Sequence, residues 1–181
     1  DYKRALNIGC LYQNPLRGTA PNLTIEENLA LAYTRKASPS FFALNKKDSA
    51  YFREVLSTLG MGLEDRMKTK IGLLSGGQRQ AASLLMATIA EPELLLLDEH
   101  TAALDPGAAE KVMALTKKIV EENKITTLMI THDMEYALEY GSRTIMLDSG
   151  KIVMDLTGKE REEMTTGKLA ELFYGKAHKR G

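Results

Sequence analysis

Apolar positions along the chain follow two different patterns, and the pattern changes close to residue 74. In the first part, apolar residues recur at the spacing of a helix face, and Thr24 and Glu27 have the spacing of a capping box. Helices are predicted there from residue 24 to a break at 38–40, over about 48–59 and, as a short piece, over 63–70. A small helical lobe over residues 24–73 is therefore expected.

After residue 74, helical patterns alternate with short apolar runs. Helices are predicted over 78–90 and 108–123, and strands over 94–97 and 126–131. The run at 94–97 is four leucines, which is typical of a strand covered on both faces. The polar residues expected to face outward from the second helix are Lys117, Lys118, Glu121 and Glu122. Such alternation predicts a parallel sheet with crossover helices.

The two ends of the chain extend this arrangement. Residues 5–12 resemble a short buried strand, which Pro15 ends because its ring cannot continue a ladder. Beyond residue 131 we expect a helix over 134–140, a hairpin of strands 143–147 and 151–156, and a helix over 166–174. The basic tail at 176–180 is expected to be solvated, with lipid contact as the alternative. The expected fold class is α/β, a parallel-sheet core with an inserted helical subdomain and a C-terminal β-hairpin.

Composition excludes several classes of function. With 24 basic and 24 acidic residues among 181, the chain has no net charge that would attract nucleic acid or anionic lipid. No apolar segment is long enough to span a membrane, and the chain starts without a leader pattern, as if within a domain. Cys10, the only cysteine, is expected to be a small buried apolar residue in a reducing compartment.

The pentapeptide at residues 74–78, Leu-Ser-Gly-Gly-Gln, carries the first candidate chemistry. Gly76 and Gly77 let backbone N–H groups approach an anion, Ser75 adds a hydroxyl donor, and the helix predicted to follow adds a favourable dipole. An ordinary turn before a helix is the plainer interpretation of two glycines. The pentapeptide alone leaves both interpretations open.

Two acids, Asp98 and Glu99, directly follow the apolar run at 94–97. A dry strand that delivers one acid to Mg²⁺ and the next to an attacking water suits a nucleotide hydrolase, although acids also end strands in solvent. Neighbours on an extended chain point to opposite sides, so the two acids could take different roles. Because open α/β sheets bind ligands at the carboxyl ends of their strands, four polar residues are expected to gather there: Gln13, Asp98, Glu99 and His132.

Taken in order, these pieces resemble the nucleotide-binding domain of the ATP-binding cassette (ABC) transporter family, over essentially the whole chain. The matching segments are the glutamine loop at 12–14, the signature at 74–78, the Walker B strand at 94–99, the D-loop at 103–105 and the switch histidine, His132. The resemblance implies a core like that of P-loop nucleotide hydrolases, formed by residues 1–23 and 74–181, with residues 24–73 as the helical subdomain.

The resemblance also implies a role for each matching residue. Glu99 would polarise the hydrolytic water, Asp98 and Gln13 would hold the Mg²⁺, and His132 would contact the γ-phosphate of ATP. Ser75, Gly76, Gly77 and Gln78 would bind the γ-phosphate of an ATP held by the other subunit of a dimer, and Asp105 would communicate across that dimer. The implied partners are a second ATP-binding subunit, transmembrane permease subunits that dock on residues 16–31, and a substrate-binding protein. No nucleic acid is expected, and the chain would lie in the cytoplasm at the inner face of the membrane.

The sequence departs from the family pattern in two respects. His100 and Ala102 stand where the family usually has Pro and Ser. More important, no G-x-x-x-x-G-K-[ST] phosphate loop occurs in the 181 residues. The chain is therefore expected to lack the N-terminal part of the domain, to be inactive alone, and to be less stable than a whole domain because the strand beside 94–97 would be absent.

Two functional hypotheses therefore remain open. The chain is part of the ATP-hydrolysing subunit of an ABC transporter, or it is a non-catalytic protein that donates its signature to a partner's ATP. A soluble family member in translation or chromosome maintenance would be expected to have a second cassette or long heptads, and neither is present. Residues 18–29 and 100–105 are similar to the bacterial subfamily presumed to serve tryptophan or tyrosine uptake.

Overall fold

The computed structural model describes residues 5–35 and 46–177, without the side chains of 46, 176 and 177. The chain forms two compact units that divide after Ile130. The first unit contains, in chain order, β1 (Ile8–Tyr12), α2 (Ile25–Tyr33), α3 (Lys46–Ser57), the 3₁₀ helix η1 (Ile71–Leu73), α4 (Gly76–Thr88), β2 (Leu94–Asp98), α5 (Pro106–Asn123) and β3 (Thr126–Ile130). The break predicted at 38–40 lies outside the described residues.

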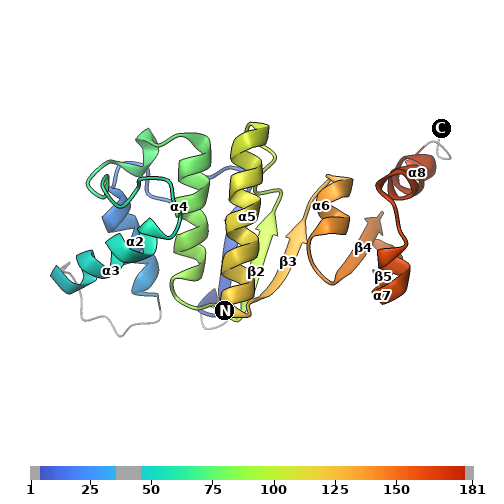
Figure 1. Ribbon diagram of the computed structural model, residues 1–181, viewed down its shortest axis with the longest axis horizontal. Helices are drawn as coiled ribbons and strands as arrows, with labels where there is room; N and C mark the ends of the chain where they lie inside the picture. The colour runs from blue at the N-terminus through green and yellow to red at the C-terminus, as the bar shows by residue number, and fades with distance from the viewer. Residues whose placement is uncertain (1–4, 36–45, 178–181) are drawn as a thin grey trace. The chain divides into compact units, whose positions relative to one another are not determined.

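The predicted parallel sheet is confirmed: β1, β2 and β3 pair in that order, all parallel (Figure 1). The strand β2 therefore has a neighbour on each side, so the expectation that it lacks one was wrong. At the carboxyl end of the sheet, Tyr12, Asp98 and Ile130 lie in register. The end of each strand thus delivers the residues that follow it to the same edge.

Helices α4 and α5 cover one face of this sheet, as Figure 1 shows. Leu11, Leu95 and Leu97 are buried beneath them, with Leu84 of α4. On the opposite face Leu128 and Ile130 are 54% and 55% exposed, and the prediction that the leucine run is covered on both faces was wrong. Cys10, paired with Leu96 in the register of that face, is likewise exposed rather than buried.

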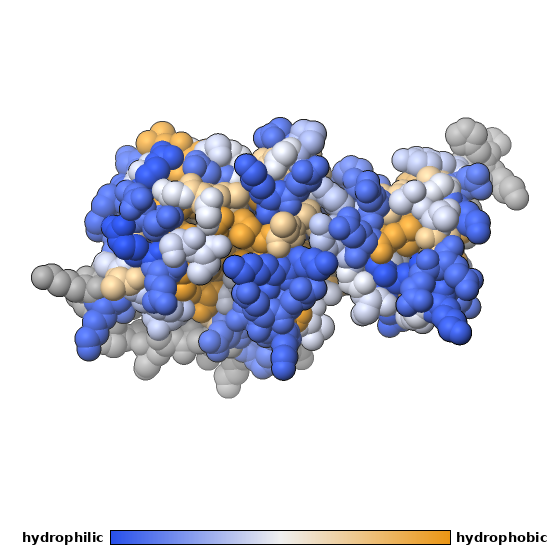
Figure 2. Space-filling view, in the orientation of Figure 1, coloured by the Kyte–Doolittle hydropathy of each residue, from blue (hydrophilic) through white to orange (hydrophobic). Residues whose placement is uncertain are grey.

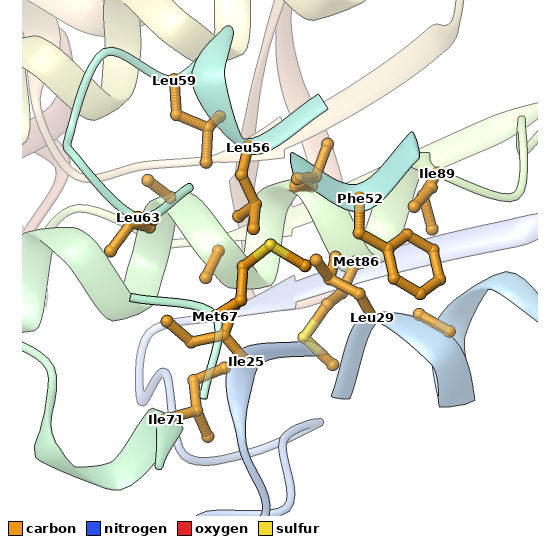
Figure 3. Packing of buried hydrophobic residues seen from close by; sticks show 14 of the residues in the cluster. Ile25, Leu29, Phe52, Leu56, Leu59, Leu63, Met67, Ile71, Met86 and Ile89 are labelled. Carbon is orange, nitrogen blue, oxygen red and sulfur yellow. The ribbon is translucent and has the colours of Figure 1, made fainter. Parts of the chain in front are cut away.

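The helical lobe packs on α4 through a continuous apolar cluster. Figure 3 shows residues of α2, α3 and the segment before η1 converging on Met86 of α4 and on Ile89, the residue that caps its end. The fully buried members from the lobe are Ile25, Leu29, Phe52, Leu56, Leu63 and Ile71. The short helix predicted over 63–70 is replaced by successive turns, in which the N–H of Arg66 bonds to Leu63 and that of Thr69 to Arg66. Apolar residues at helical spacing in this segment, such as Leu63 and Met67, are therefore buried although the segment is not a helix.

The second unit contains α6 (Met134–Glu139), β4 (Arg143–Asp148), β5 (Lys151–Thr157), α7 (Gly158–Glu162) and α8 (Thr166–Ala177). The predicted hairpin is confirmed, since β4 and β5 pair antiparallel and turn through Ser149 and Gly150, both at positive φ. The short helix α7 had no signal in the sequence pattern. Among the helices that the structure describes, none is long and apolar enough to cross a membrane.

The outer side of α5 is hydrophilic, as the sequence pattern predicts. Figure 2 shows a broad polar surface over this helix. Its exposed residues include all four that were expected to face outward, namely Lys117, Lys118, Glu121 and Glu122. The amphipathic pattern of α5 therefore orients its apolar side toward the sheet.

Candidate functional site

The signature pentapeptide forms the start of α4, the helix that the sequence pattern predicts to follow it. Ser75 is the N-cap residue, and its Oγ accepts from the backbone N–H of Gln78 at 3.2 Å, while Gln78 Oε1 accepts from the N–H of Ser75 at 3.4 Å. This is a capping box. Ser75 and Gly76 are exposed, so the amino end of a 13-residue helix lies at the surface. An anion at that end would meet free N–H groups and a favourable dipole.

Arg79 holds the chain that leads into the pentapeptide. Its Nη2 donates to the backbone oxygens of Gly72 and Leu74 at 2.8 and 2.7 Å, and its Nε donates to Ile71 at 3.2 Å. One planar guanidinium thus satisfies three carbonyls in the turn before Ser75. The backbone that leads into the candidate anion site is therefore held in place by these hydrogen bonds.

The two signature glycines also contact the segment after β2. A Cβ placed on Gly77 would lie 3.0 Å from the Ala108 Cβ of α5, and one on Gly76 would lie 3.2 Å from Leu104 Cδ2. These distances are tighter than ordinary van der Waals contact, so α4 and α5 approach closely where both begin. The glycines consequently serve helix packing in addition to any anion binding.

The carboxyl edge of the sheet brings together three of the predicted site residues. Gln13 follows Tyr12 directly, Asp98 ends β2, and both side chains are exposed. The N–H of Glu99 donates to the backbone oxygen of Ile130 at 3.0 Å, which continues the ladder one residue beyond β2. An amide and two carboxyl groups therefore follow neighbouring strand ends.

Glu99 has a left-handed backbone, with φ of 45°. The chain is therefore not extended at Glu99, as was assumed in predicting that Asp98 and Glu99 point to opposite sides. A non-glycine residue in this region costs about 1 kcal/mol or more, and such residues are frequent at functional sites. The turn continues through a hydrogen bond from the N–H of Ala102 to the Glu99 oxygen at 3.0 Å.

His100 is a residue that sequence reasoning missed, since it was noted only as a departure from the family pattern. Its side chain is buried, and Nε2 lies 3.2 Å from Thr116 Oγ1 in the middle of α5. Burial lowers the pKa of this imidazole from its usual 6.5 to about 4. A neutral histidine thus ties the segment after Glu99 to the helix that covers the sheet.

Two further predicted residues have defined places in the chain. Asp105 is the N-cap of α5, where its Oδ1 accepts from the N–H of Ala108 at 3.0 Å. A role for Asp105 across a dimer stays a prediction. His132 follows β3 by two residues, is exposed and belongs to the second unit. Its proposed contact with a γ-phosphate also stays a prediction.

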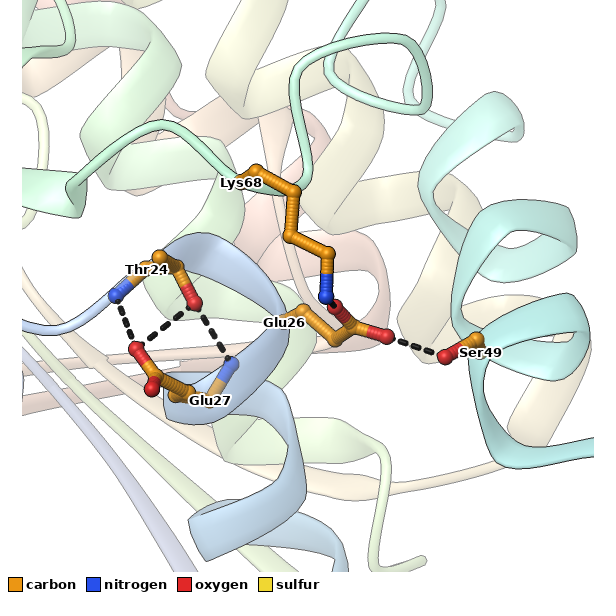
Figure 4. A network of polar contacts seen from close by, with 5 residues as sticks. All are labelled: Thr24, Glu26, Glu27, Ser49 and Lys68. Atoms are coloured by element: carbon orange, nitrogen blue, oxygen red, sulfur yellow. Dashed lines mark hydrogen bonds and ion pairs between the residues drawn. The ribbon is translucent and has the colours of Figure 1, made fainter. Parts of the chain in front are cut away.

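Glu26, at the start of α2, forms a polar network that the sequence pattern did not indicate. Its carboxylate is 1% exposed and accepts from Lys68 Nζ and from Ser49 Oγ (Figure 4). Burial alone would raise the pKa of Glu26, but the bonds from Lys68 and Ser49 outweigh it and lower the pKa. Beside it, Thr24 and Glu27 form the capping box predicted from their spacing.

The described residues contain no group of three or more His, Cys, Asp or Glu side chains that could hold a metal ion by themselves. The pair predicted for Mg²⁺, Gln13 and Asp98, offers one amide oxygen and one carboxylate at the same edge. Mg²⁺ usually binds one or two carboxylates together with substrate phosphates and waters. This donor set therefore fits a cation that arrives with a nucleotide.

Comparison with known proteins gives one consistent result. The family model described as "ABC transporter" matches residues 2–102. A tyrosine transport ATP-binding protein of Clostridioides difficile is 42% identical over 173 residues, which cover 96% of this chain and 69% of that protein. A phosphonates import ATP-binding protein of Oceanobacillus iheyensis is 35% identical over 152 residues, covering 82% and 58%.

Among solved structures, a dimeric ATP-binding cassette in a post-hydrolysis state, bound to ADP and phosphate, superposes with a TM-score of 0.69. Its sequence identity to this chain is 30%, and the match covers 83% of this chain and 62% of the solved one. The 181 residues thus span about three fifths to two thirds of the length of these three proteins.

Proposed function

Because the chain belongs to the ABC transporter family of ATP-binding proteins, we propose that it acts as one half of a dimeric ATP-binding subunit that drives import through permease subunits. The chain supplies the signature to an ATP held by the other half. Its own Glu99 polarises the attacking water, Asp98 and Gln13 bind Mg²⁺, and His132 contacts the γ-phosphate.

The observation that carries this proposal is the presentation of the signature. Ser75 and Gly76 are exposed at the start of a 13-residue helix whose preceding turn is fixed by Arg79. The helix end faces solvent and leaves room for a phosphate from outside the chain. We infer that this phosphate belongs to the ATP held by the other half of the dimer.

The docking surface for the permease is residues 16–31. Leu16, Leu23 and Leu31 are 42%, 36% and 49% exposed, respectively. Asn28 is fully buried beneath them, and its side chain bonds to the backbone of Ala20 through both its oxygen and its nitrogen. A loop and the start of a helix with exposed leucines suit a protein partner. The transported compound is proposed to be an aromatic amino acid, delivered by a substrate-binding protein.

A complementation assay tests this proposal. A second cassette that carries the phosphate loop, but whose own signature serine is replaced by arginine, is mixed with this chain, and Mg²⁺-dependent ATP turnover is measured. We expect turnover with the wild-type chain and only the background of the second cassette with Ser75→Arg. Ser57→Arg, at an exposed serine at the end of α3, is the control that keeps turnover.

The non-catalytic alternative is separated by one further variant. If this chain only donates its signature, Glu99→Gln leaves turnover in the mixture unchanged. If Glu99 polarises the water that attacks the ATP bound in the mixed dimer, Glu99→Gln reduces this turnover. The absence of any turnover with the wild-type chain would contradict both forms of the proposal.

A further inference from the structure

Gln80, in the second turn of α4, is fully buried and reaches a strand that is distant in the sequence. Its Nε2 donates to the backbone oxygen of Tyr12 at 3.1 Å. Tyr12 is the last residue of β1, and Gln13 follows it directly. The signature helix is therefore bonded to the residue that begins the glutamine loop.

The amide of Gln80 is a poor device for stability. Its Oε1 is buried and has no hydrogen-bond partner among the described residues. A buried acceptor without a partner destabilises the fold by at least as much free energy as one ordinary hydrogen bond contributes to it. Since one half of the amide is satisfied and the other is not, a nonpolar side chain of equal length would serve the core as well.

Two other contacts join the same elements. A Cβ on Gly9 would lie 2.5 Å from the backbone oxygen of Ala87, so β1 and α4 touch directly at that point. Further along, Ser83 Oγ lies 3.5 Å from the Pro15 oxygen, at the limit of a hydrogen bond. On the strand side the Gln80 bond, at Tyr12, lies between Gly9 and Pro15 in sequence, where β1 gives way to the loop.

We propose that Gln80 is a positioning residue that fixes the glutamine loop to the signature helix. The consequence of this bond rests on the proposed function. When a docked partner displaces residues 13–19, the bond transmits the displacement to the start of α4, one turn before Gln80. The hydrogen bond fixes the position of the glutamine loop, and burying Oε1 without a partner lowers the stability of the fold.

Hydrogen exchange of the full chain, measured without nucleotide, tests the bond. In Gln80→Met the loop amides that bond locally, those of Leu16, Arg17 and Thr19, should exchange about fivefold faster. Amides of α4 and β2 and the urea midpoint should not change. Thr88→Val is the matched control, because the buried hydroxyl of Thr88 bonds only within α4. Unchanged loop exchange, or a uniform rise in all segments, would overturn the proposal.

Turnover in the complementation mixture provides a second readout. Gln80→Met should lower kcat with little change in KM for ATP, because ATP is held elsewhere and the loop is misplaced. An unchanged kcat would overturn the link between the loop and the site. If even the wild-type mixture shows no turnover, the proposed function fails, while hydrogen exchange still decides whether Gln80 holds the loop.

Discussion

His100 Nε2 and Thr116 Oγ1 lie 3.2 Å apart, and both side chains are buried. The Thr116 hydroxyl also donates to the backbone oxygen of Val112 at 2.8 Å. Because one hydroxyl carries one proton, Thr116 Oγ1 must accept from His100, which assigns the ring proton to Nε2. Because burial lowers its pKa to about 4, the imidazole is neutral near pH 7, and protonating it would place a charge in the core.

Stability should fall as the pH drops from about 6.5 to about 4. The unfolded chain binds a proton at His100 near its usual pKa of 6.5, whereas the folded chain does so only near 4. Between these values the unfolded state binds more protons, so the free energy of unfolding decreases with falling pH, by roughly 3 kcal/mol at pH 4 from this residue. Urea unfolding at a series of pH values measures it.

His100→Gln is the control for that measurement. Glutamine can still donate to Thr116 but does not titrate. The variant should lose most of the pH dependence between 4 and 6.5 that distinguishes the wild-type chain. An equally steep dependence in the variant would assign the effect to other groups.

The two signature glycines should respond differently to alanine. Alanine in a helix gains up to about 1 kcal/mol over glycine. At Gly76 the added methyl meets only the end of the Leu104 side chain, which can move. At Gly77 it meets the Ala108 Cβ of a packed helix, so overpacking offsets the gain. Thermal unfolding should show Gly77→Ala to be less stable than Gly76→Ala by about 1 kcal/mol; the reverse order would contradict the packing argument.

The uncovered face of the sheet should make the isolated chain associate. Leu128 and Ile130 alternate on β3 and are each more than half exposed. Such a patch on a strand promotes self-association. Leu128→Lys should shift sedimentation toward the monomer, whereas Met129→Lys, on the covered face, should instead destabilise the fold. A monomeric wild-type chain with a cooperative melt at high temperature would contradict this.

Short-range signals in the sequence predicted most of the elements. The capping box at Thr24, the helix that follows the signature, the leucine strand and the hairpin turn at Ser149 are all local, and all were found. What failed depends on partners distant in the chain. The coverage of β2 depends on which helices pack on each face, and the burial of His100 depends on Thr116, sixteen residues later.

The turn at Glu99 could not be predicted for a related reason. Its positive φ follows from the ladder bond to Ile130 and from the anchoring of the next residue, both long-range. Likewise, Gln80 follows the signature in sequence without any pattern that points to Tyr12. Residue types at the site were therefore predictable, but the contacts that position them were not.

Two ion pairs of the helical lobe should differ in their contribution to stability. Lys68 pairs with the buried Glu26, whereas Arg53 and Asp65 pair at 3.0 Å with both side chains more than half exposed. Lys68→Met leaves the Glu26 carboxylate with Ser49 as its remaining side-chain partner, which should cost about 1–3 kcal/mol. Arg53→Met removes a solvated pair and should cost less than about 1 kcal/mol.

Chemical unfolding of both variants, with the double variant Glu26→Gln/Lys68→Met, decides the matter. The double variant should recover part of the loss, because the charge left behind in Lys68→Met is then removed. Equal losses for Lys68→Met and Arg53→Met would mean that water solvates Glu26 despite its 1% exposure. The burial of one partner, rather than the presence of an ion pair, is what should set the difference.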